Sequence, residues 1–384
     1  MTFILKLKQL RLNVKIAFYR LFPLCENKII LWANNFRQYG CSPKYITEYL
    51  LEKYPNKYDI VWVFGQVEQI PNEIPDTVRV VRYFSYEYLK ELHTAKFIIC
   101  NMRTGASYFW KKRRGQIYIQ TWHSSLRLKK IEGDALEHFS SSYIQQAKDD
   151  SARIDLLLSG CSFSSEIFRR AFWYDGEIME VGTPRCDVLL QSNAKARARA
   201  KVYHYFSISE NSKLVLYAPT FRSNKEPTFL GMDFCRLKEV LEMDGTNWII
   251  GTRLHPNILS SLDVDNAITM SKYPDMQELL AASELLITDY SSCMFDMAIA
   301  RKPCVLYVPD IDEYVSKERG LYFDFDELPF PIAKSMGELQ HVIQHFVRET
   351  YLAKVEEFLN RIGSFEDGNA AKHVCGYINR NFNK

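Results

Sequence analysis

The stretch that decides the fold is "ELLITDYSSCMFDMAIARKPCVLYVPD", which runs from Glu284 to Asp310. Its first apolar run ends at Asp289, two serines follow, and a helical stretch then leads to a second apolar run that begins at Cys304. Aliphatic and β-branched runs separated by helices are typical of a parallel sheet that is covered on both faces.

The same alternation continues on both sides of this stretch. Expected strands in the first half include "KIILWANNF", "YDIVWVFG", "VRVVRYFS", "KFIICN", "QIYIQTWH" and "DLLLSG". After the polar stretch "QSNAKARARAKVYHYFSISENSK" it restarts with "KLVLYAPTF", "WIIGTRLHP" and "AITMS". We therefore predict an α/β protein with two Rossmann-like, doubly wound domains that face each other across a cleft, at residues 27–190 and 205–384. The last helix is a candidate to pack back on the first domain.

Composition sets limits on the function. The 384 residues are 47% hydrophobic and 25% charged, which is typical of a globular protein with room for two cores. A formal net charge of +3 gives no reason to expect a nucleic-acid partner. The nine cysteines form no C-x-x-C pair, so we expect buried, reduced thiols in a reducing compartment, and no cluster has the spacing of a metal site.

Residues 1–26 are expected to form an amphipathic helix rather than a secretory signal, because lysines and arginines interrupt every apolar run. One face of this helix collects Phe3, Leu7, Leu10, Val14, Ala17 and Leu21. Another face carries Lys8, Arg11 and Lys15. Such a helix suits the surface of an anionic membrane, and it equally suits packing against the body of the protein.

Two histidines end expected strands, one in each half of the chain. His123 ends "IYIQTWH" and His255 ends "WIIGTRLHP". Ligands of open α/β sheets bind beyond the carboxyl ends of the strands, so we expect both histidines to face one crevice. Arg253 shares the face of His255 on an extended strand and suits a phosphate, although pairing with a core carboxylate is the alternative.

Three further stretches carry polar groups. Ser291 or Ser292 is a natural N-cap, and the helix start behind it can bind an anion, with plain capping as the alternative. "LYAPTFR" ends a strand with Pro219, Thr220 and Arg222, which could hold the base or phosphates of a nucleotide. "KKRRG" is either a solvated turn or a contact for an anionic polymer. The absence of G-x-G-x-x-G and P-loop motifs disfavours a dinucleotide cofactor and ATP.

Six blocks in the same order resemble the bacterial CDP-glycerol glycerophosphotransferase family. They are "QTWHSSLRLKKIEGD", "VGTPRCDVLL", "YAPTFR", "TRLHP", "ITDYSSCMFDMAIARKPCVLYVPD" and "RGLYFDF". The resemblance implies a glycosyltransferase-B fold, with residues 27–190 as the acceptor domain and residues 205–384 as the CDP-donor domain. In this sequence Ser124 stands where the family usually has a glycine.

The resemblance also implies roles for individual residues. His123 corresponds to a histidine proposed as catalytic base, and His255 with Arg253 is expected at the pyrophosphate of the donor. The remaining donor residues are expected to be Pro219, Thr220, Arg222, Ser291, Ser292 and Asp296. The loop toward the acceptor is expected to include Ser124, Ser125 and Lys129.

The function that follows is transfer of a polyol phosphate, either glycerol phosphate or ribitol phosphate, from a CDP-activated donor. The acceptor would be a hydroxyl of a lipid-linked or polymeric surface glycan, such as a teichoic acid or a capsule, and CMP would be released without a cofactor. We expect the enzyme on the cytoplasmic face of the bacterial membrane, as a peripheral protein. The alternatives are a nucleotide-sugar glycosyltransferase of the same fold and a polymer-binding protein without activity.

Overall fold

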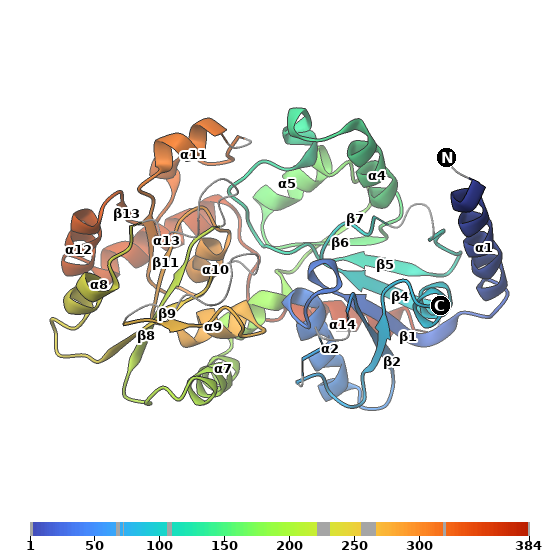
Figure 1. Cartoon of the computed structure of the whole chain (residues 1–384), viewed down its shortest axis with the longest axis horizontal. Helices are drawn as coiled ribbons and strands as arrows, with labels where there is room; N and C mark the ends of the chain where they lie inside the picture. Colours follow the sequence, from blue (N-terminus) through green and yellow to red (C-terminus); the bar gives the residue numbers. More distant parts are fainter. Residues whose placement is uncertain are drawn as a thin grey trace.

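The chain forms two parallel β-sheets that lie side by side, each surrounded by helices (Figure 1). The computed structural model describes residues 3–66, 70–71, 73–105, 110–220, 231–254, 266–317 and 320–382. Every strand pair within these residues is parallel. The predicted α/β fold with two Rossmann-like sheets is therefore confirmed.

The first sheet is built from the first half of the chain. Its strands, in spatial order, are β3 (Arg79–Arg82), β2 (Asp59–Phe64), β1 (Cys25–Trp32), β4 (Ala95–Cys100), β5 (Ile117–Gln120), β6 (Leu156–Ser159) and β7 (Glu177–Glu180). Its helices are α1 (Phe3–Tyr19), α2 (Cys41–Lys53), α3 (Tyr86–Thr94), α4 (Ser141–Ser151) and α5 (Ser162–Ala171). The central strands β1, β4 and β5 are almost wholly buried, as their continuous apolar sequences require.

The second sheet follows the order β10 (Ile268–Thr269), β9 (Trp248–Thr252), β8 (Lys213–Ala218), β11 (Leu285–Thr288), β12 (Cys304–Tyr307) and β13 (Ile332–Ala333). Its helices are α6 (Asp187–Leu190), α7 (Ser192–Tyr205), α8 (Phe234–Leu241), α9 (Met276–Ala282), α10 (Cys293–Ile299), α11 (Ile311–Lys317), α12 (Met336–Gln344) and α13 (Arg348–Arg361). The stretch from Glu284 to Asp310 forms β11, α10 and β12, and β11 pairs with β12 in parallel. The opening pattern thus folds as predicted.

The final helix and the polar stretch that follows residue 190 both pack against a domain core. The final helix α14 (Ala370–Arg380) lies beneath the first sheet (Figure 1), and Val374 and Ile378 share a buried cluster with Ile46 and Leu50. The polar stretch after residue 190 is not an extended connection. It forms α7, which packs on the second core through residues such as Val202, because small and apolar side chains recur on one face.

The N-terminal helix α1 lies at the outer edge of the first sheet (Figure 1) and packs against the body of the protein through Leu12, Ile16 and Tyr19. The face predicted from the sequence points outward instead. On that face Leu7 is 40%, Leu10 59% and Val14 61% exposed, and the neighbouring Phe18 is 55% exposed. The helix is shorter than the predicted residues 1–26, because α1 ends at Tyr19 and β1 begins at Cys25, so Leu21, which is 81% exposed, lies beyond the helix. No helix in the described part of the chain is long and apolar enough to cross a membrane.

The cysteines follow the prediction in most positions. All nine are free, and six of them are buried: Cys100, Cys161, Cys186, Cys293, Cys304 and Cys375. Cys25 and Cys41 are half-buried, and the expectation of burial is wrong for Cys235, which is exposed next to the Asn266 side chain.

Candidate active site

The first part of the site is the turn that follows β5. Trp122 adopts a left-handed backbone conformation with φ 52°, which is strained for a bulky residue. Its N–H donates to Oε1 of Gln120 at 3.0 Å, and its ring packs edge-on against Phe172 at 4.8 Å between centroids. This buried turn ends the strand abruptly and places His123 at the carboxyl edge of the first sheet.

The ring of His123 is fixed by the neighbouring strand β4. Nδ1 lies 3.2 Å from the carbonyl oxygen of Asn101, and a carbonyl can only accept a hydrogen bond. Nδ1 must therefore carry the proton in this contact, which makes Nε2 the basic nitrogen of the neutral ring. Asn101 is held in turn by Asn34 at the end of β1, since their side-chain and backbone groups exchange two hydrogen bonds of 2.9 Å.

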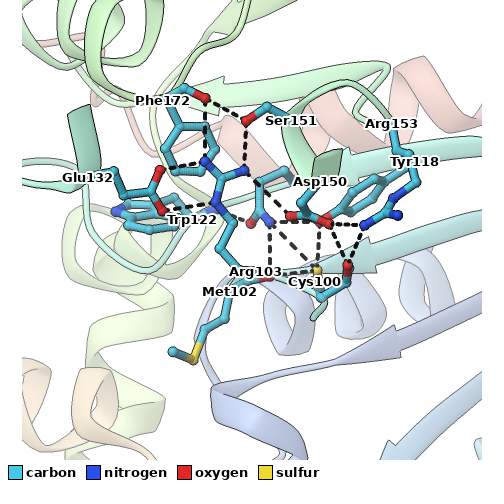
Figure 2. Close-up of polar contacts among 12 residues, drawn as sticks. Cys100, Met102, Arg103, Tyr118, Trp122, Glu132, Asp150, Ser151, Arg153 and Phe172 are labelled. Carbon is cyan, nitrogen blue, oxygen red and sulfur yellow. Dashed lines mark hydrogen bonds and ion pairs between the residues drawn. The ribbon is translucent and has the colours of Figure 1, made fainter. Parts of the chain in front are cut away.

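A buried polar network lies behind this turn (Figure 2). Arg103 binds the carboxylate of Glu132 through two nitrogens, at 2.9 and 2.5 Å, and donates to Ser151 at 2.7 Å. Its guanidinium also stacks 3.4 Å from the centroid of the Phe172 ring. Because the network joins the loops on both sides of Trp122, it keeps the strained turn rigid.

The loop after His123 crosses to the second domain. Lys130 N–H donates to the Gly320 carbonyl and Tyr322 N–H donates to the Leu128 carbonyl, both at 2.8 Å. The Lys129 ammonium lies 5.0 Å from the centroid of the Tyr314 ring. Two of the six sequence blocks, "SSLRLKK" and "RGLYF", are thus brought together.

Ser124 and Ser125, which were predicted to face the acceptor, are buried within this loop. The Ser125 carbonyl accepts a hydrogen bond from Ser164 Oγ at 2.6 Å. Their contact with an acceptor stays a prediction, and the structure gives them a packing role.

In the second domain, the ends of β8 and β11 are joined by Asp289. Its carboxylate accepts from the Thr220 N–H at 2.8 and 2.9 Å and from Thr220 Oγ1 at 2.6 Å. The Tyr290 N–H donates to the same carboxylate at 2.6 Å. Asp289 was not among the site residues predicted from the sequence. Its position directly after a strand, one residue before the polar turn, was the available signal.

The two serines lie at the start of α10, as predicted. Ser292 occupies the N-cap position, but its side chain makes no capping hydrogen bond. Ser291 Oγ accepts a long contact of 3.5 Å from the Cys293 N–H. Both serines are half-buried, so their hydroxyl groups are not consumed by plain capping.

Arg253 directly follows β9, and within the described residues the hydrogen bonds of its side chain go to backbone carbonyl oxygens rather than to a carboxylate. Its Nη1 donates to the carbonyl oxygens of Tyr273 at 2.8 Å and Met270 at 3.4 Å. Burial lowers the pKa of this guanidinium below its usual value. The contact of Arg253 with a donor phosphate stays a prediction. Two other predicted site residues, His255 and Arg222, lie outside the described residues.

Asp296 lies on the buried side of α10, only 1% exposed. It pairs with the guanidinium of Arg185, which follows β7. Burial lowers the pKa of Arg185, but the adjacent carboxylate more than offsets this and the pKa is raised. The predicted phosphate contact of Asp296 is not tested, and the structure places the side chain in an ion pair instead.

Two Rossmann-like sheets with a histidine and paired serines at their carboxyl edges have the architecture of the glycosyltransferase-B fold, with the candidate site where such sheets bind ligands. The sequence matches the family described as CDP-glycerol:poly(glycerophosphate) glycerophosphotransferase over residues 14–380. The chain therefore belongs to this family, and the predicted class of enzyme, a glycerophosphotransferase-like phosphotransferase, is confirmed.

Curated relatives and solved structures agree with this assignment. A teichoic acid poly(glycerol phosphate) polymerase of Bacillus spizizenii is 31% identical over 92% of each chain. The polymerase of Staphylococcus epidermidis is 32% identical over 90% of this chain, which spans only 49% of that relative. The solved wall teichoic acid polymerase TagF superposes with a TM-score of 0.85 at 29% identity, covering 99% of this chain and 96% of that chain.

Proposed function

We propose that this chain transfers glycerol phosphate from CDP-glycerol to a terminal hydroxyl of a teichoic acid-like poly(glycerol phosphate), with release of CMP. Glycerol is favoured over ribitol by the relatives. Those named for glycerol phosphate polymers are 30–32% identical, whereas those named for ribitol phosphate polymers are 24–26% identical. A structure of TagF soaked with CDPG supports the choice of donor.

The observation that carries the proposal is the fixed tautomer of His123 beside a loop that reaches the donor domain. In the reaction, the acceptor oxygen forms a bond to the β-phosphorus while the bond from that phosphorus to the bridging oxygen breaks and CMP leaves. The acceptor proton passes to Nε2 of His123, which acts as general base. Ser291, Ser292 and the backbone held by Asp289 are proposed to bind the phosphates, because such donors stabilise developing charge.

The proposal includes no resident metal or cofactor, since arginine, serine and backbone donors supply the contacts to phosphate. CMP release is therefore expected to continue at the same rate in EDTA. A loss of activity on chelation that Mg²⁺ restores would contradict this part of the proposal.

Donor competition tests the proposed function. The purified chain is incubated with CDP-glycerol, CDP-ribitol or UDP-GlcNAc and a short poly(glycerol phosphate) acceptor, and the released nucleotide is identified. We expect CMP from CDP-glycerol, slower release from CDP-ribitol and none of the uridine nucleotides. Release of UDP from UDP-GlcNAc, with no CMP from either CDP-polyol, would instead support the nucleotide-sugar glycosyltransferase.

A membrane-surface role for α1 is the second part of the proposal. Leu10, Val14 and Phe18 form an outward apolar stripe. The nearby turn "KKRRG" adds exposed Lys111 and Arg114, and it is tied to α1 because Arg20 donates to the Lys111 carbonyl at 2.5 Å. An apolar stripe beside basic residues suits the anionic cytoplasmic face of a membrane, where a lipid-linked teichoic acid or capsule acceptor would be found.

Flotation with vesicles that contain phosphatidylglycerol tests this role. Changing Leu10, Val14 and Phe18 together to Ser removes apolar contact worth on the order of 4 kcal/mol, so binding should be lost. The variant Asn13→Ser, on an exposed polar position of the same helix, is the control and should float like the native chain. Equal flotation of the triple variant would exclude α1 as the membrane contact.

A further inference from the structure

The segment Thr183–Asp187, which belongs to the block "VGTPRCDVLL", has no part in the chemistry proposed above. It nevertheless contacts four separate regions of the chain. Thr183 donates from its N–H at 3.0 Å and from Oγ1 at 2.8 Å to the carboxyl oxygens of Glu366. Asp187 accepts from the first N–H groups of α14, from Ala370 at 3.0 Å and from Ala371 at 2.8 Å. The segment is therefore fixed at both ends.

Between these ends, the side chain of Arg185 reaches both domains. Nη1 donates to the carbonyl oxygen of His123 in the first domain. Nη2 donates to Gln277 on α9 at 2.8 Å and to the Asp296 carboxylate on α10. The side chain of Arg185 is only 11% exposed and that of Asp296 only 2%. One buried guanidinium thus connects the backbone of the candidate base with α10, the helix that directly follows Ser291 and Ser292.

We infer that Arg185 is a positioning residue that sets the location of His123 relative to the donor phosphates. The inference rests on the proposed function, because it takes His123 as the base and the start of α10 as a phosphate contact. Arg185 touches neither substrate. It acts through the His123 carbonyl on one side and through Asp296 and Gln277 on the other.

The geometry explains why an arginine is needed. Three acceptors from two domains surround one planar group, and only a guanidinium presents several donors in a fixed fork. A lysine has a single ammonium and cannot hold all three acceptors in the same plane. Because a small misplacement of a reacting group lowers the rate strongly, loosening this link should affect turnover more than binding.

Steady-state kinetics of Arg185→Met and Arg185→Lys test the inference. With CDP-glycerol we expect kcat to fall roughly 10- to 100-fold, while the KM of the donor stays within about threefold. The matched control is Lys44→Met. It breaks another buried ion pair between the two domains, from α2 to Asp275 at 2.5 Å and Glu278 at 2.7 Å, which does not touch His123. This control should lose stability and keep its kcat.

A double variant separates positioning from stability. In Arg185→Met with Asp296→Leu, an apolar pair replaces the ion pair, and such replacements commonly restore stability. We expect the thermal midpoint to recover while kcat stays low, because the donation from Arg185 to the His123 carbonyl is still lost. Recovery of kcat together with stability would reduce Arg185 to a structural residue and overturn the inference.

Hydrogen exchange gives a readout that needs no turnover. Arg185→Met should increase exchange in residues 119–126 and 291–297, whereas Lys44→Met should not increase it there. Unchanged exchange in these two segments would overturn the inference, whichever donor the enzyme uses. If the proposed function is wrong, the native chain will release no CMP from CDP-glycerol. That result is independent of the exchange measurement, so the two failures can be told apart.

Discussion

The hydrogen bonds of Asp289 give a quantitative prediction for Asp289→Asn. The carboxylate is fully buried, and within the described part of the chain its hydrogen bonds come from the Thr220 N–H, Thr220 Oγ1 and the Tyr290 N–H. Hydrogen bonds to a charged acceptor contribute roughly 1.5–3 kcal/mol and neutral ones roughly 0.5–1.5 kcal/mol. Losing the charge from three bonds should therefore lower the free energy of unfolding by about 3 kcal/mol.

The effect should also reach donor binding, because Thr220 is predicted to line the nucleotide pocket. Urea unfolding measures the stability, and calorimetric titration with CDP-glycerol measures the affinity, which we expect to weaken about tenfold, equivalent to the loss of one such contact. Thr220→Val removes the hydroxyl bond of 2.6 Å to Asp289 and keeps the backbone N–H bonds to the same carboxylate. The double variant Asp289→Asn with Thr220→Val should be less destabilised than the sum of the single variants.

The control is Asp244→Asn in the same domain. Asp244 is exposed and accepts a backbone hydrogen bond from the Thr246 N–H at 2.9 Å. Removing the charge of this exposed side chain should change the free energy of unfolding by less than about 0.5 kcal/mol. If Asp289→Asn matched this control in both stability and donor affinity, the account of how β8 and β11 hold the donor site would be refuted.

Three further predictions concern the parts that surround the site. Burial raises the pKa of Glu366 to about 8, so the folded state keeps a proton that the unfolded chain has lost. The thermal stability should therefore fall as the pH rises from about 5 to 8, and Glu366→Gln should flatten this fall. An equally steep fall in the variant would show that Glu366 is not the group that titrates. Asp187→Asn leaves one N–H at the start of α14 without its acceptor, so the free energy of unfolding measured in urea should fall by about 1 kcal/mol. An unchanged free energy of unfolding would exclude the capping role of Asp187. Tyr322→Phe removes hydrogen bonds to Asp134 at 2.8 Å and from Ile131 at 3.2 Å, so hydrogen exchange of residues 128–132 should increase; unchanged protection would show that the backbone pairing alone fixes this loop.

Much of the fold was predictable because a buried strand requires a continuous run of apolar residues, which is visible in the local sequence. The apolar run from Leu285 to Ile287 forms, with Thr288, a fully buried central strand. The polar residues that follow such strands lie at one edge of each sheet, which allowed His123 and Ser291 to be placed without knowledge of the packing. Local periodicity failed for α7, where a polar composition concealed a single buried face that includes Val202.

Contacts between distant segments were not predictable from one sequence. Asp296 was assigned to phosphate from its position near the serines, yet its partner is Arg185, which is 111 positions away in the chain. A buried carboxylate requires a cation, but local spacing does not reveal which cation the fold delivers. The sequence predicted an apolar face for residues 1–26 and left open whether that face points inward, but the helix itself ends at Tyr19. The structure shows that Ile16, on another side of the helix, makes the contact with the body of the protein.

The central claim is that His123 accepts the proton of the acceptor hydroxyl, and turnover measured beside donor binding in His123→Ala tests it most directly. CMP release should fall roughly 100-fold or more, the usual contribution of a general base. Calorimetric titration with CDP-glycerol should give nearly the native affinity, because the proposed donor contacts lie in the second domain, and a thermal melt confirms that the variant is folded. A folded His123→Ala variant that releases CMP at the native rate would contradict the account.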